Sequence, residues 1–211
     1  MGIHESQSRL WENVIGRSLS FWEAMFPVLR SYFPGALTLI STEGFFRAIN
    51  LVEPSFIRVE ADEVSYSLHI ILRFELEKAL FQGRLSPEDL PSAWREKMGE
   101  FLGVEPETDS QGVLQDIHWA IGAFGYFPSY ALGNLYGLQF WEKLSSDIPH
   151  TEEMISEGNF TLIRAWLRDN IFVWGRRSDP EVLLKTVTGK NLSAEPFLKY
   201  IESKYNDVYG S

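Results

Sequence analysis

Residues 62–83 decide the fold class, and they read DEVSYSLHIILRFELEKALFQG. Their apolar residues recur at the three- and four-residue spacing of one face of an α-helix. These residues are Val64, Leu68, Ile71, Leu72, Leu76 and Leu80. Asp62 is a good N-cap, because its side chain can accept hydrogen bonds from the first backbone amides of a helix, and Gly83 is a good stop. The stretch therefore predicts a long helix from Asp62 to Phe81.

The same helical period extends through most of the chain on both sides of this stretch. The first pattern runs from Ile3 to Phe26, and Pro27 and the turn Phe33-Pro34-Gly35 are expected to close it. Further helices are expected near 42–52, 86–103, 115–121, 129–144, 152–157, 160–173, from Pro180 onward, and near 194–205. A short extended segment is favoured only at 56–59. We therefore predict an all-α class with little or no sheet, in a single helical domain over residues 1–211.

The composition excludes several classes of function. The chain has 19 Lys and Arg against 29 Asp and Glu, and its formal net charge is −10. Nucleic-acid binders need a cationic surface, so no nucleic-acid partner is expected. The absence of cysteine excludes disulfides, thiolate metal sites and a cysteine nucleophile, and it fits a reducing cytoplasm. No signal peptide is recognisable and no apolar run approaches the roughly 20 residues of a membrane span, so no membrane partner is expected.

His4-Glu5 is a candidate metal-binding pair, because zinc peptidases often place His-Glu on a helix. The helical signature needs a second histidine four residues after the first, but Ser8 occupies that position. Glu5 and Arg9 are instead spaced for an ordinary helical ion pair. On the residues alone, the ion pair is the favoured interpretation.

His118 is the histidine best placed for chemistry. It lies two residues after Asp116, so a carboxylate can orient its imidazole for acid–base work or for hydrogen bonding in a transition state. A packed structural role beside Trp119 is the alternative. His69 falls inside the predicted helix and is expected to be structural, and His150 is expected to be solvated.

Arg58 and the segment Gly122–Tyr130 are candidates for substrate contacts. Arg58 stands just before the predicted long helix and can clamp a carboxylate through two hydrogen bonds. It can equally pair with Glu60 or Asp62. Glycine in the segment 122–130 permits a close backbone approach to a ligand, so this segment can line a groove, although packing between helices explains the same residues.

Three segments resemble, in the same order, the motifs of the thermostable (Taq-type) metallocarboxypeptidases. Residues 2–13, GIHESQSRLWEN, are similar to that family's His-Glu-Ser-Gln motif and its flank. Residues 57–62, IRVEAD, match its Ile-Arg-x-x-Ala-Asp motif, and residues 112–119, GVLQDIHW, match Gly-x-x-Gln-Asp-x-His-Trp. Residues 124–128, FGYFP, Gly175-Arg176-Arg177 and the final helix continue the resemblance. Because three long motifs occur in order, the resemblance is specific.

The resemblance implies a gluzincin-like helical metallopeptidase that hydrolyses peptides by releasing single C-terminal residues. In that family one zinc, for which cobalt often substitutes, is held by the two histidines of a His-Glu-x-x-His helix and by a downstream glutamate. The glutamate falls in the His-Glu-Ser-Gln motif, so Glu5 would be the third metal ligand.

The other two motifs line the substrate groove of the family. The resemblance implies that Arg58 binds the terminal carboxylate of the peptide and that His118 hydrogen-bonds the scissile carbonyl or its oxyanion. Tyr126 or Tyr130 would assist. The groove motifs also contain Asp62, Gln115 and Asp116.

The chain departs from the family in one respect that limits its chemistry. His-Glu-x-x-His and the family's Asp-x-Arg-x-Thr motif occur nowhere in the 211 residues. In the family both lie upstream, so the resemblance implies a C-terminal portion without the N-terminal portion that carries two metal ligands and the general base. A catalytic zinc needs about three protein ligands and a water. We therefore expect Glu5 alone to hold no metal and the chain alone to be inactive.

Two other functions stay open. The chain can be a non-catalytic remnant that binds peptide C-termini through Arg58. It can also be a helical scaffold or dimerisation unit, since members of the family commonly pair as homodimers. As a piece of an enzyme, its expected partners are peptide C-termini and the missing N-terminal portion.

Overall fold

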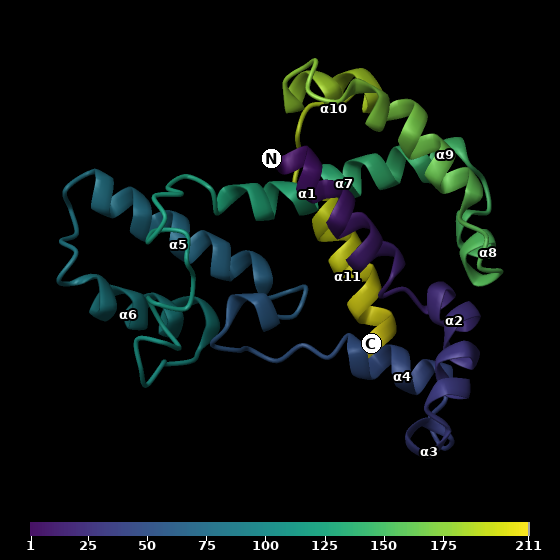
Figure 1. Ribbon diagram of the computed structural model, residues 1–211, viewed down its shortest axis with the longest axis horizontal. Helices are drawn as coiled ribbons and strands as arrows, with labels where there is room; N and C mark the ends of the chain where they lie inside the picture. The colour runs from purple at the N-terminus through teal and green to yellow at the C-terminus, as the bar shows by residue number, and fades with distance from the viewer. Residues whose placement is uncertain (211) are drawn as a thin grey trace. The chain divides into compact units, whose positions relative to one another are not determined.

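The computed structural model describes residues 1–210, and within them the regular structure is helical, without a strand (Figure 1). This confirms the predicted all-α class. The helices divide into two compact units, each with its own core of buried side chains. The first unit contains residues 1–50 and the chain from Leu132 onward, and the second contains Leu51–Ala131.

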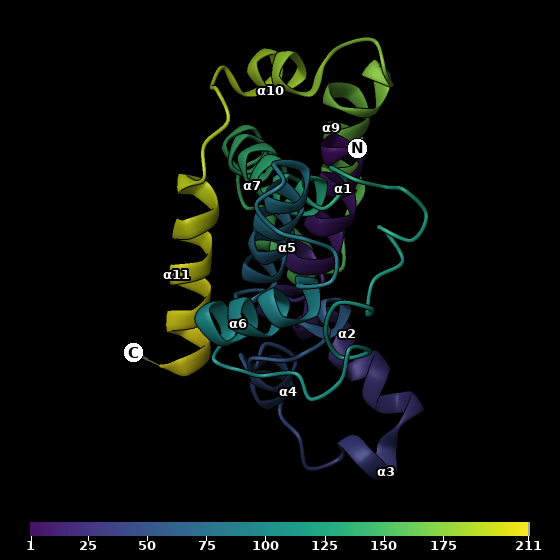
Figure 2. The same cartoon turned by 90° about the vertical axis from the view of Figure 1, so that its left-hand side faces the viewer.

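The first unit contains most of α7 (Pro128–Asp147), whose first turn belongs to the second unit. Its other helical elements are α1 (Gly2–Arg9), a π-helical segment (Leu10–Ile15), α2 (Leu19–Tyr32), α3 (Pro34–Leu37), α4 (Thr42–Ile49), α8 (Thr151–Ser156), α9 (Thr161–Asn170), a 3₁₀ turn (Phe172–Trp174), α10 (Pro180–Thr188) and α11 (Glu195–Tyr209). A core between these helices contains Leu10, Ile15, Phe140, Leu144, Ile155, Ile163, Leu167 and Leu184. Helices α2, α3 and α4 lie together at one end of the unit, with α3 at the tip (Figure 2).

Helix α1 lies directly against α7, and two glycines of α7 make this contact possible. A Cβ atom at Gly133 would fall 2.5 Å from Glu5 Cγ, and one at Gly137 would fall 3.1 Å from the carbonyl oxygen of Ser6. Ser6 is fully buried at this contact. Because only hydrogen fits at these two positions, the backbones of the two helices approach each other closely.

The predicted helical region 3–26 is three elements. Pro27 does not close it, but the predicted turn at Phe33-Pro34-Gly35 does, since α2 ends at Tyr32. The amide of Gly16 donates to the carbonyl oxygen of Trp11 (2.9 Å), which is the wide spacing of a π-helix. The chain then turns, and the side chain of Ser18 caps α2. Pro27 lies inside α2. Proline removes one backbone donor from the helix, but the packing of α2 against α4 and α8 stabilises the helix beyond it.

The second unit contains α5 (Tyr66–Phe81) and α6 (Leu90–Leu102), which pack side by side (Figure 1). The core between them contains Leu72, Leu76, Leu90, Trp94, Met98 and Leu102. Leu72 and Leu76 belong to the apolar stripe of residues 62–83, so the predicted core face of this helix is confirmed. Gly103 ends α6 in the left-handed conformation, with a φ of 68°.

Helix α5 begins at Tyr66 rather than directly after Asp62, because Asp62 caps the turn that precedes the helix. Its Oδ1 accepts hydrogen bonds from the backbone amides of Val64 and Ser65 (2.8 Å each), and its Oδ2 accepts from Ser65 Oγ (2.7 Å). The carboxylate thus stabilises the turn that leads into α5, and it lies one turn before the position of a helix N-cap.

Two local predictions in the second unit are wrong. Residues 115–121 form turns in place of the predicted helix. The amide of Ile121 donates to the carbonyl oxygen of Ile117 (3.1 Å) and closes one helical turn, but Gly122 then adopts a φ of 74° and ends it. Where an extended segment is expected at 56–59, a 3₁₀ turn begins at Arg58.

The prediction of a single domain over residues 1–211 stays a prediction. Two compact units within one folded chain do not say whether either of them folds alone. None of the helices in residues 1–210 combines the length and hydropathy that a bilayer span requires.

Gly133→Ala is expected to destabilise the first unit. The new methyl group would overlap Glu5 Cγ at 2.5 Å, and overpacking of this kind costs about 1–3 kcal/mol. Gly99→Ala is the matched control, since Gly99 lies within α6 and, apart from its chain neighbours and the backbone of its own helix, no described atom lies within 4 Å of an added Cβ. The control should gain about 0.5–1 kcal/mol, because alanine favours a helix over glycine. Thermal unfolding followed by circular dichroism measures both. Equal stability of the two variants would contradict the close contact between α1 and α7.

Candidate functional site

Asp116 lies at the centre of a cluster of motif residues in the second unit. Its side chain is 9% exposed, and each of its carboxylate oxygens binds a different arginine. Oδ1 accepts from Nε (3.0 Å) and Nη2 (2.7 Å) of Arg58, and Oδ2 accepts from Nε of Arg73 (2.7 Å). Asp116 thus joins two segments that lie 58 and 43 residues away along the chain.

Gln115 connects the same two arginines from the neighbouring position. Its Oε1 accepts from the backbone amide of Arg58 (2.8 Å) and from Nη2 of Arg73 (2.7 Å). Its Nε2 donates to the carbonyl oxygens of Phe56 (2.9 Å) and Gln111 (2.8 Å). The side-chain amide therefore holds the segment before Arg58 against the turn that contains Asp116.

Both arginines are buried and lie over aromatic rings. Arg58 (6% exposed) donates from Nη1 to Tyr66 Oη (3.1 Å), and its guanidinium carbon lies 4.8 Å from the ring centre of Tyr130. The guanidinium carbon of Arg73 (0% exposed) lies 4.6 Å from the ring centre of Trp94. Aromatic faces attract cations, and here they also keep water from the two guanidinium groups.

The pKa values of these groups keep the cluster ionised at neutral pH. Burial alone would raise the pKa of Asp116, but the hydrogen bonds and charges of Arg58 and Arg73 outweigh it and hold this pKa below its usual range. Burial lowers the pKa of Arg73 to about 10, although the carboxylate of Asp116 opposes the shift. Burial acts in the same direction on Arg58, but the hydrogen bonds and charge of Asp116 prevail and raise its pKa.

His118 lies beside this cluster and pairs with a tyrosine. Its Nε2 is 3.0 Å from Tyr130 Oη, while its Nδ1 is 3.8 Å from Asp116 Oδ1, beyond hydrogen-bond distance. Its ring lies on Phe127, with centroids 4.4 Å apart, and 5.5 Å from the ring of Tyr126. Burial lowers the pKa of His118. The carboxylate of Asp116 opposes this shift, and the charges of Arg58 and Arg73 add to it. The imidazole is therefore neutral at pH 7, and a neutral imidazole beside a phenol can donate a hydrogen bond to a carbonyl oxygen.

Glu77 holds the loop that carries His118. Its buried carboxylate accepts from Trp119 Nε1 through Oε2 (2.9 Å) and from the backbone amide of Gly125 through Oε1. Trp119 follows His118 directly, and Gly125 directly precedes Tyr126. One side chain of α5 thereby fixes both ends of the loop between the two candidate residues.

His69 is fully buried on α5, and neither of its ring nitrogens has a hydrogen-bond partner within the described residues. Its backbone carbonyl accepts from Nη1 of Arg73 (2.8 Å). Burial and the nearby charges of Arg73 and Arg58 lower the pKa of His69 to about 4. The burial of the ring agrees with the structural role predicted for this residue.

The residues of α5 that hold the motif residues in place are not among those predicted from the sequence. Tyr66, Arg73 and Glu77 share one row of α5 with His69. The spacing of three and four residues along this row was a usable signal, because a polar row beside a core stripe is buried only where it finds partners.

Two other predicted site residues bind elsewhere. Asp62 uses both carboxylate oxygens in the turn before α5. Glu5 lies on α1 in the first unit, where its Oε1 accepts from Arg9 Nε (3.0 Å). The ion pair predicted for these two residues is confirmed.

The described residues do not fit a complete metal centre. Among residues 1–210, no group of three or more His, Cys, Asp or Glu side chains is placed to hold a metal ion. A catalytic zinc needs about three protein ligands. Glu5 offers one carboxylate, and this carboxylate is paired with Arg9.

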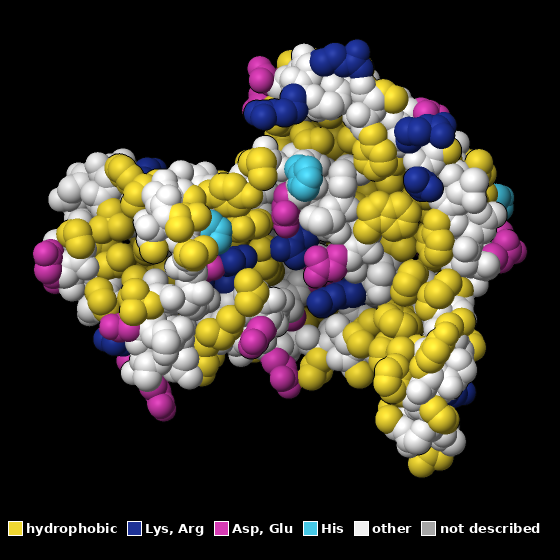
Figure 3. Space-filling model, in the orientation of Figure 1, with side chains coloured by type: hydrophobic (Ala, Val, Ile, Leu, Met, Phe, Trp, Pro, Cys, Tyr) yellow, Lys and Arg dark blue, Asp and Glu magenta, His cyan; other side chains and the backbone are white. Residues whose placement is uncertain are grey.

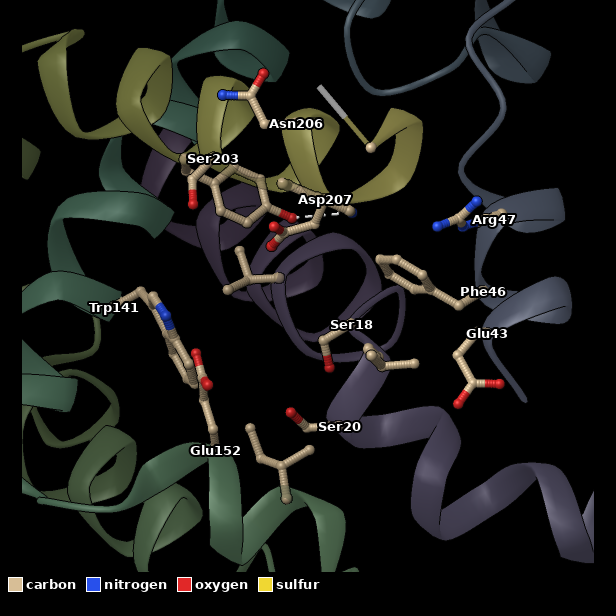
Figure 4. A pocket seen from close by; sticks show the side chains of 16 residues that line it. Ser18, Ser20, Glu43, Phe46, Arg47, Trp141, Glu152, Ser203, Asn206 and Asp207 are labelled. Atoms are coloured by element: carbon tan, nitrogen blue, oxygen red, sulfur yellow. Dashed lines mark hydrogen bonds between the residues drawn. The ribbon is translucent and has the colours of Figure 1, made fainter. Parts of the chain in front are cut away.

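A cavity of about 750 Å³ lies in the first unit (Figure 4). Trp141, Glu152, Arg47 and Asp207 are among the side chains that line it, and they come from α7, α8, α4 and α11. None of its described lining residues belongs to the three motifs. The candidate site is therefore defined by the polar cluster around Asp116 and not by this cavity.

Comparison with known proteins decides the family. The family described as carboxypeptidase Taq (M32) metallopeptidase matches residues 1–205. The chain belongs to the M32 metallopeptidase family. This membership confirms the resemblance carried by the three motifs.

Members of the M32 family are similar along the whole chain. Thermostable carboxypeptidase 1 of Thermus thermophilus is 54% identical over 210 residues, and carboxypeptidase 1 of Bacillus subtilis is 46% identical over 209 residues. The crystal structure of M32 carboxypeptidase from Deinococcus radiodurans R1 matches 100% of this chain with a TM-score of 0.97, at 42% identity. The chain spans 41% and 42% of the lengths of these two curated relatives and 42% of that solved chain.

Protonation of His69 is expected to destabilise the protein as the pH falls from about 6.5 to about 4. The ordinary pKa of histidine is 6.5 and that of folded His69 is about 4, so between these values the unfolded chain binds more protons and stability falls with pH. The total loss is on the order of 3 kcal/mol. His69→Leu should remove this dependence, whereas His150→Asn, at an exposed histidine, should keep it. Urea unfolding at a series of pH values measures the slope, and an unchanged slope in His69→Leu would contradict the account.

Proposed function

We propose that this chain supplies the substrate-recognition part of a metal-dependent carboxypeptidase, which releases single residues from peptide C-termini. One observation carries the proposal: Arg58 from one groove motif and Gln115 and Asp116 from the other form a single hydrogen-bonded cluster. A buried guanidinium suits a terminal carboxylate, and a neutral imidazole paired with a phenol suits a scissile carbonyl. The curated relatives are named as carboxypeptidases.

Arg58 is the proposed contact for the terminal carboxylate of the peptide. A guanidinium carries five N–H donors, and three of those of Arg58 bind Asp116 and Tyr66. The remaining two, one on Nη1 and one on Nη2, have no partner among the described side chains. Two donors on one planar group match the two oxygens of a carboxylate.

His118 is the proposed donor to the scissile carbonyl and to the oxyanion that forms from it. Tyr130, at 3.0 Å from Nε2, orients the imidazole, and Tyr126 lies beside the pair. Asp116 and Gln115 keep Arg58 in place, and Asp62 shapes the turn that follows Arg58. A donor aimed at developing negative charge is worth about 10²–10³ in rate.

Glu5 is the proposed third ligand of a zinc ion, or of a cobalt ion in its place, in a complete enzyme. Metal dependence comes with the metallopeptidase family. The two further ligands and the general base would be supplied by the portion of the relatives that this chain does not span. Pairing as a homodimer and a location in the cytoplasm stay predictions.

Exposed apolar side chains support the proposal that the remaining portion of the enzyme packs against this chain. Tyr32, Phe33 and Leu39 are exposed in the first unit, and Leu114, Ile117 and Ile121 are exposed in the second. The space-filling view shows hydrophobic side chains over much of one face (Figure 3). Apolar surface of this kind is normally covered by another part of the protein or by a partner.

The test measures bound zinc and the hydrolysis of a blocked dipeptide. The chain alone is expected to bind almost no zinc and to cleave nothing. Addition of the remaining portion of the Thermus thermophilus relative should give about one zinc per complex and hydrolysis. In this mixture His118→Ala should lower kcat about 100-fold or more, while the exposed-residue control His150→Asn should leave kcat unchanged.

Two outcomes would contradict the proposal. If the mixture binds zinc but cleaves no peptide, the chain is not part of an active carboxypeptidase. This result would favour a non-catalytic unit that binds peptide C-termini. Turnover by the chain alone, with stoichiometric zinc, would show that the metal site forms without the remaining portion of the relatives.

A further inference from the structure

Arg73 is the charged residue of the cluster that belongs to no motif of the sequence analysis. It is fully buried on α5 and donates from Nε to Asp116, from Nη1 to the carbonyl oxygen of His69, and from Nη2 to Gln115. All three nitrogens of its guanidinium are thus bound inside the protein. Unlike Arg58, whose side chain is 7% exposed, Arg73 has a side chain that is 0% exposed and does not reach a ligand. Its effect on binding therefore acts through its charge and its partners.

The three charges that contact one another, those of Arg58, Arg73 and Asp116, sum to one positive charge. Asp116 is the carboxylate that pairs with Arg58 and Arg73, and the described part of the chain gives them no second one. The nearby carboxylates of Asp62 and Glu77 bind the turn before α5 and the loop 119–125. These two carboxylates are negative as well, but neither is paired with an arginine of the cluster, so Arg58 and Arg73 share one contacting carboxylate in a setting that is largely closed to water.

Without Arg73, the charges of Arg58 and Asp116 would cancel. Arg58 binds Oδ1 through two nitrogens, at 3.0 and 2.7 Å, and such a pair leaves little net attraction for a third group. Arg73 binds the other oxygen at 2.7 Å and compensates the carboxylate from the opposite side. The charge of Arg58 then stays available to an anion.

We propose that Arg73 is a positioning and specificity-determining residue, whose charge makes the site select peptides with an ionised C-terminal carboxylate. This inference rests on the proposed function, in which Arg58 contacts the end of the peptide. Arg73 does not touch the peptide. It keeps Asp116 compensated, so that the charge of Arg58 stays available to the terminal carboxylate.

Lysine and methionine at position 73 separate charge from geometry. Lysine keeps the positive charge but cannot bind Asp116, Gln115 and the carbonyl oxygen of His69 at once, because its donors share one nitrogen. Methionine fills a similar volume without charge. A purely structural role would make both variants weaker binders of every ligand to the same degree, whereas a charge-based role separates them.

The experiment is calorimetry of the chain with an N-blocked dipeptide and with the C-terminal amide of the same dipeptide. The wild-type chain should bind the acid about 10-fold to 100-fold more tightly than the amide. In Arg73→Met this ratio should fall to within about threefold of one, and in Arg73→Lys most of it should remain. Arg84→Met is the matched control: it removes an exposed arginine of the same unit, bound to Gln82, and should keep the wild-type ratio.

Arg73→Lys gives a second reading that does not depend on Arg73→Met folding. A folded Arg73→Lys chain that loses the wild-type ratio of acid to amide binding would overturn the inference.

The other outcomes are also decisive. A folded Arg73→Met chain that keeps the wild-type ratio overturns the inference and leaves the proposed function standing. A wild-type chain that binds the acid and the amide equally overturns both the inference and the role of Arg58. The hydrolysis assay with the remaining portion of the relative then decides separately whether the chain is part of a carboxypeptidase.

Discussion

One carboxylate shared between two guanidinium groups organises the second unit. Asp116 brings the 3₁₀ turn at Arg58, helix α5 at Arg73 and its own loop to a single point. A buried charge without its partner costs several kcal/mol, so none of the three residues can be lost without penalising the other two. The hydrogen bonds of Gln115 add a second connection between the same segments. The long loop between α6 and α7 owes its conformation to these side chains and not to a regular backbone pattern.

Helix α5 serves the core and the site with adjacent faces. Leu72 and Leu76 pack toward α6, while Arg73 and Glu77, each one position further along, bind the loop. Trp94 of α6 belongs to both regions: it is part of the core and lies under the guanidinium of Arg73. The site is therefore built on a rigid helix pair, and its geometry depends on the packing of the unit as a whole.

Local spacing predicted the helices better than it predicted the site. The apolar period of residues 62–83 was sufficient for the core face of α5, because core burial follows directly from helical geometry. The interior position of Pro27 was not predictable, since the packing that stabilises α2 comes from helices distant in sequence. The turn at 115–121 was missed because the interactions that shape it, such as that of Gln115 with Phe56, span 59 residues.

The site residues also divide into those that the sequence predicts and those that it does not. Arg58, Asp116 and His118 were predicted from motifs, and the structure brings them to one place. Arg73 was not predicted, because a polar row on a helix says that partners exist but not which they are. The charge balance of the cluster depends on Arg73, so the motifs alone do not predict this balance.

The two bonds of Glu77 have a consequence for the thermodynamics of ligand recognition. They tie the loop of His118 to α5 at Trp119 and at Gly125 without any ligand. The conformational entropy of this loop is thus lost when the protein folds and not when a ligand binds. A preorganised loop of this kind lowers the entropic cost of binding a ligand, since the loop needs no rearrangement.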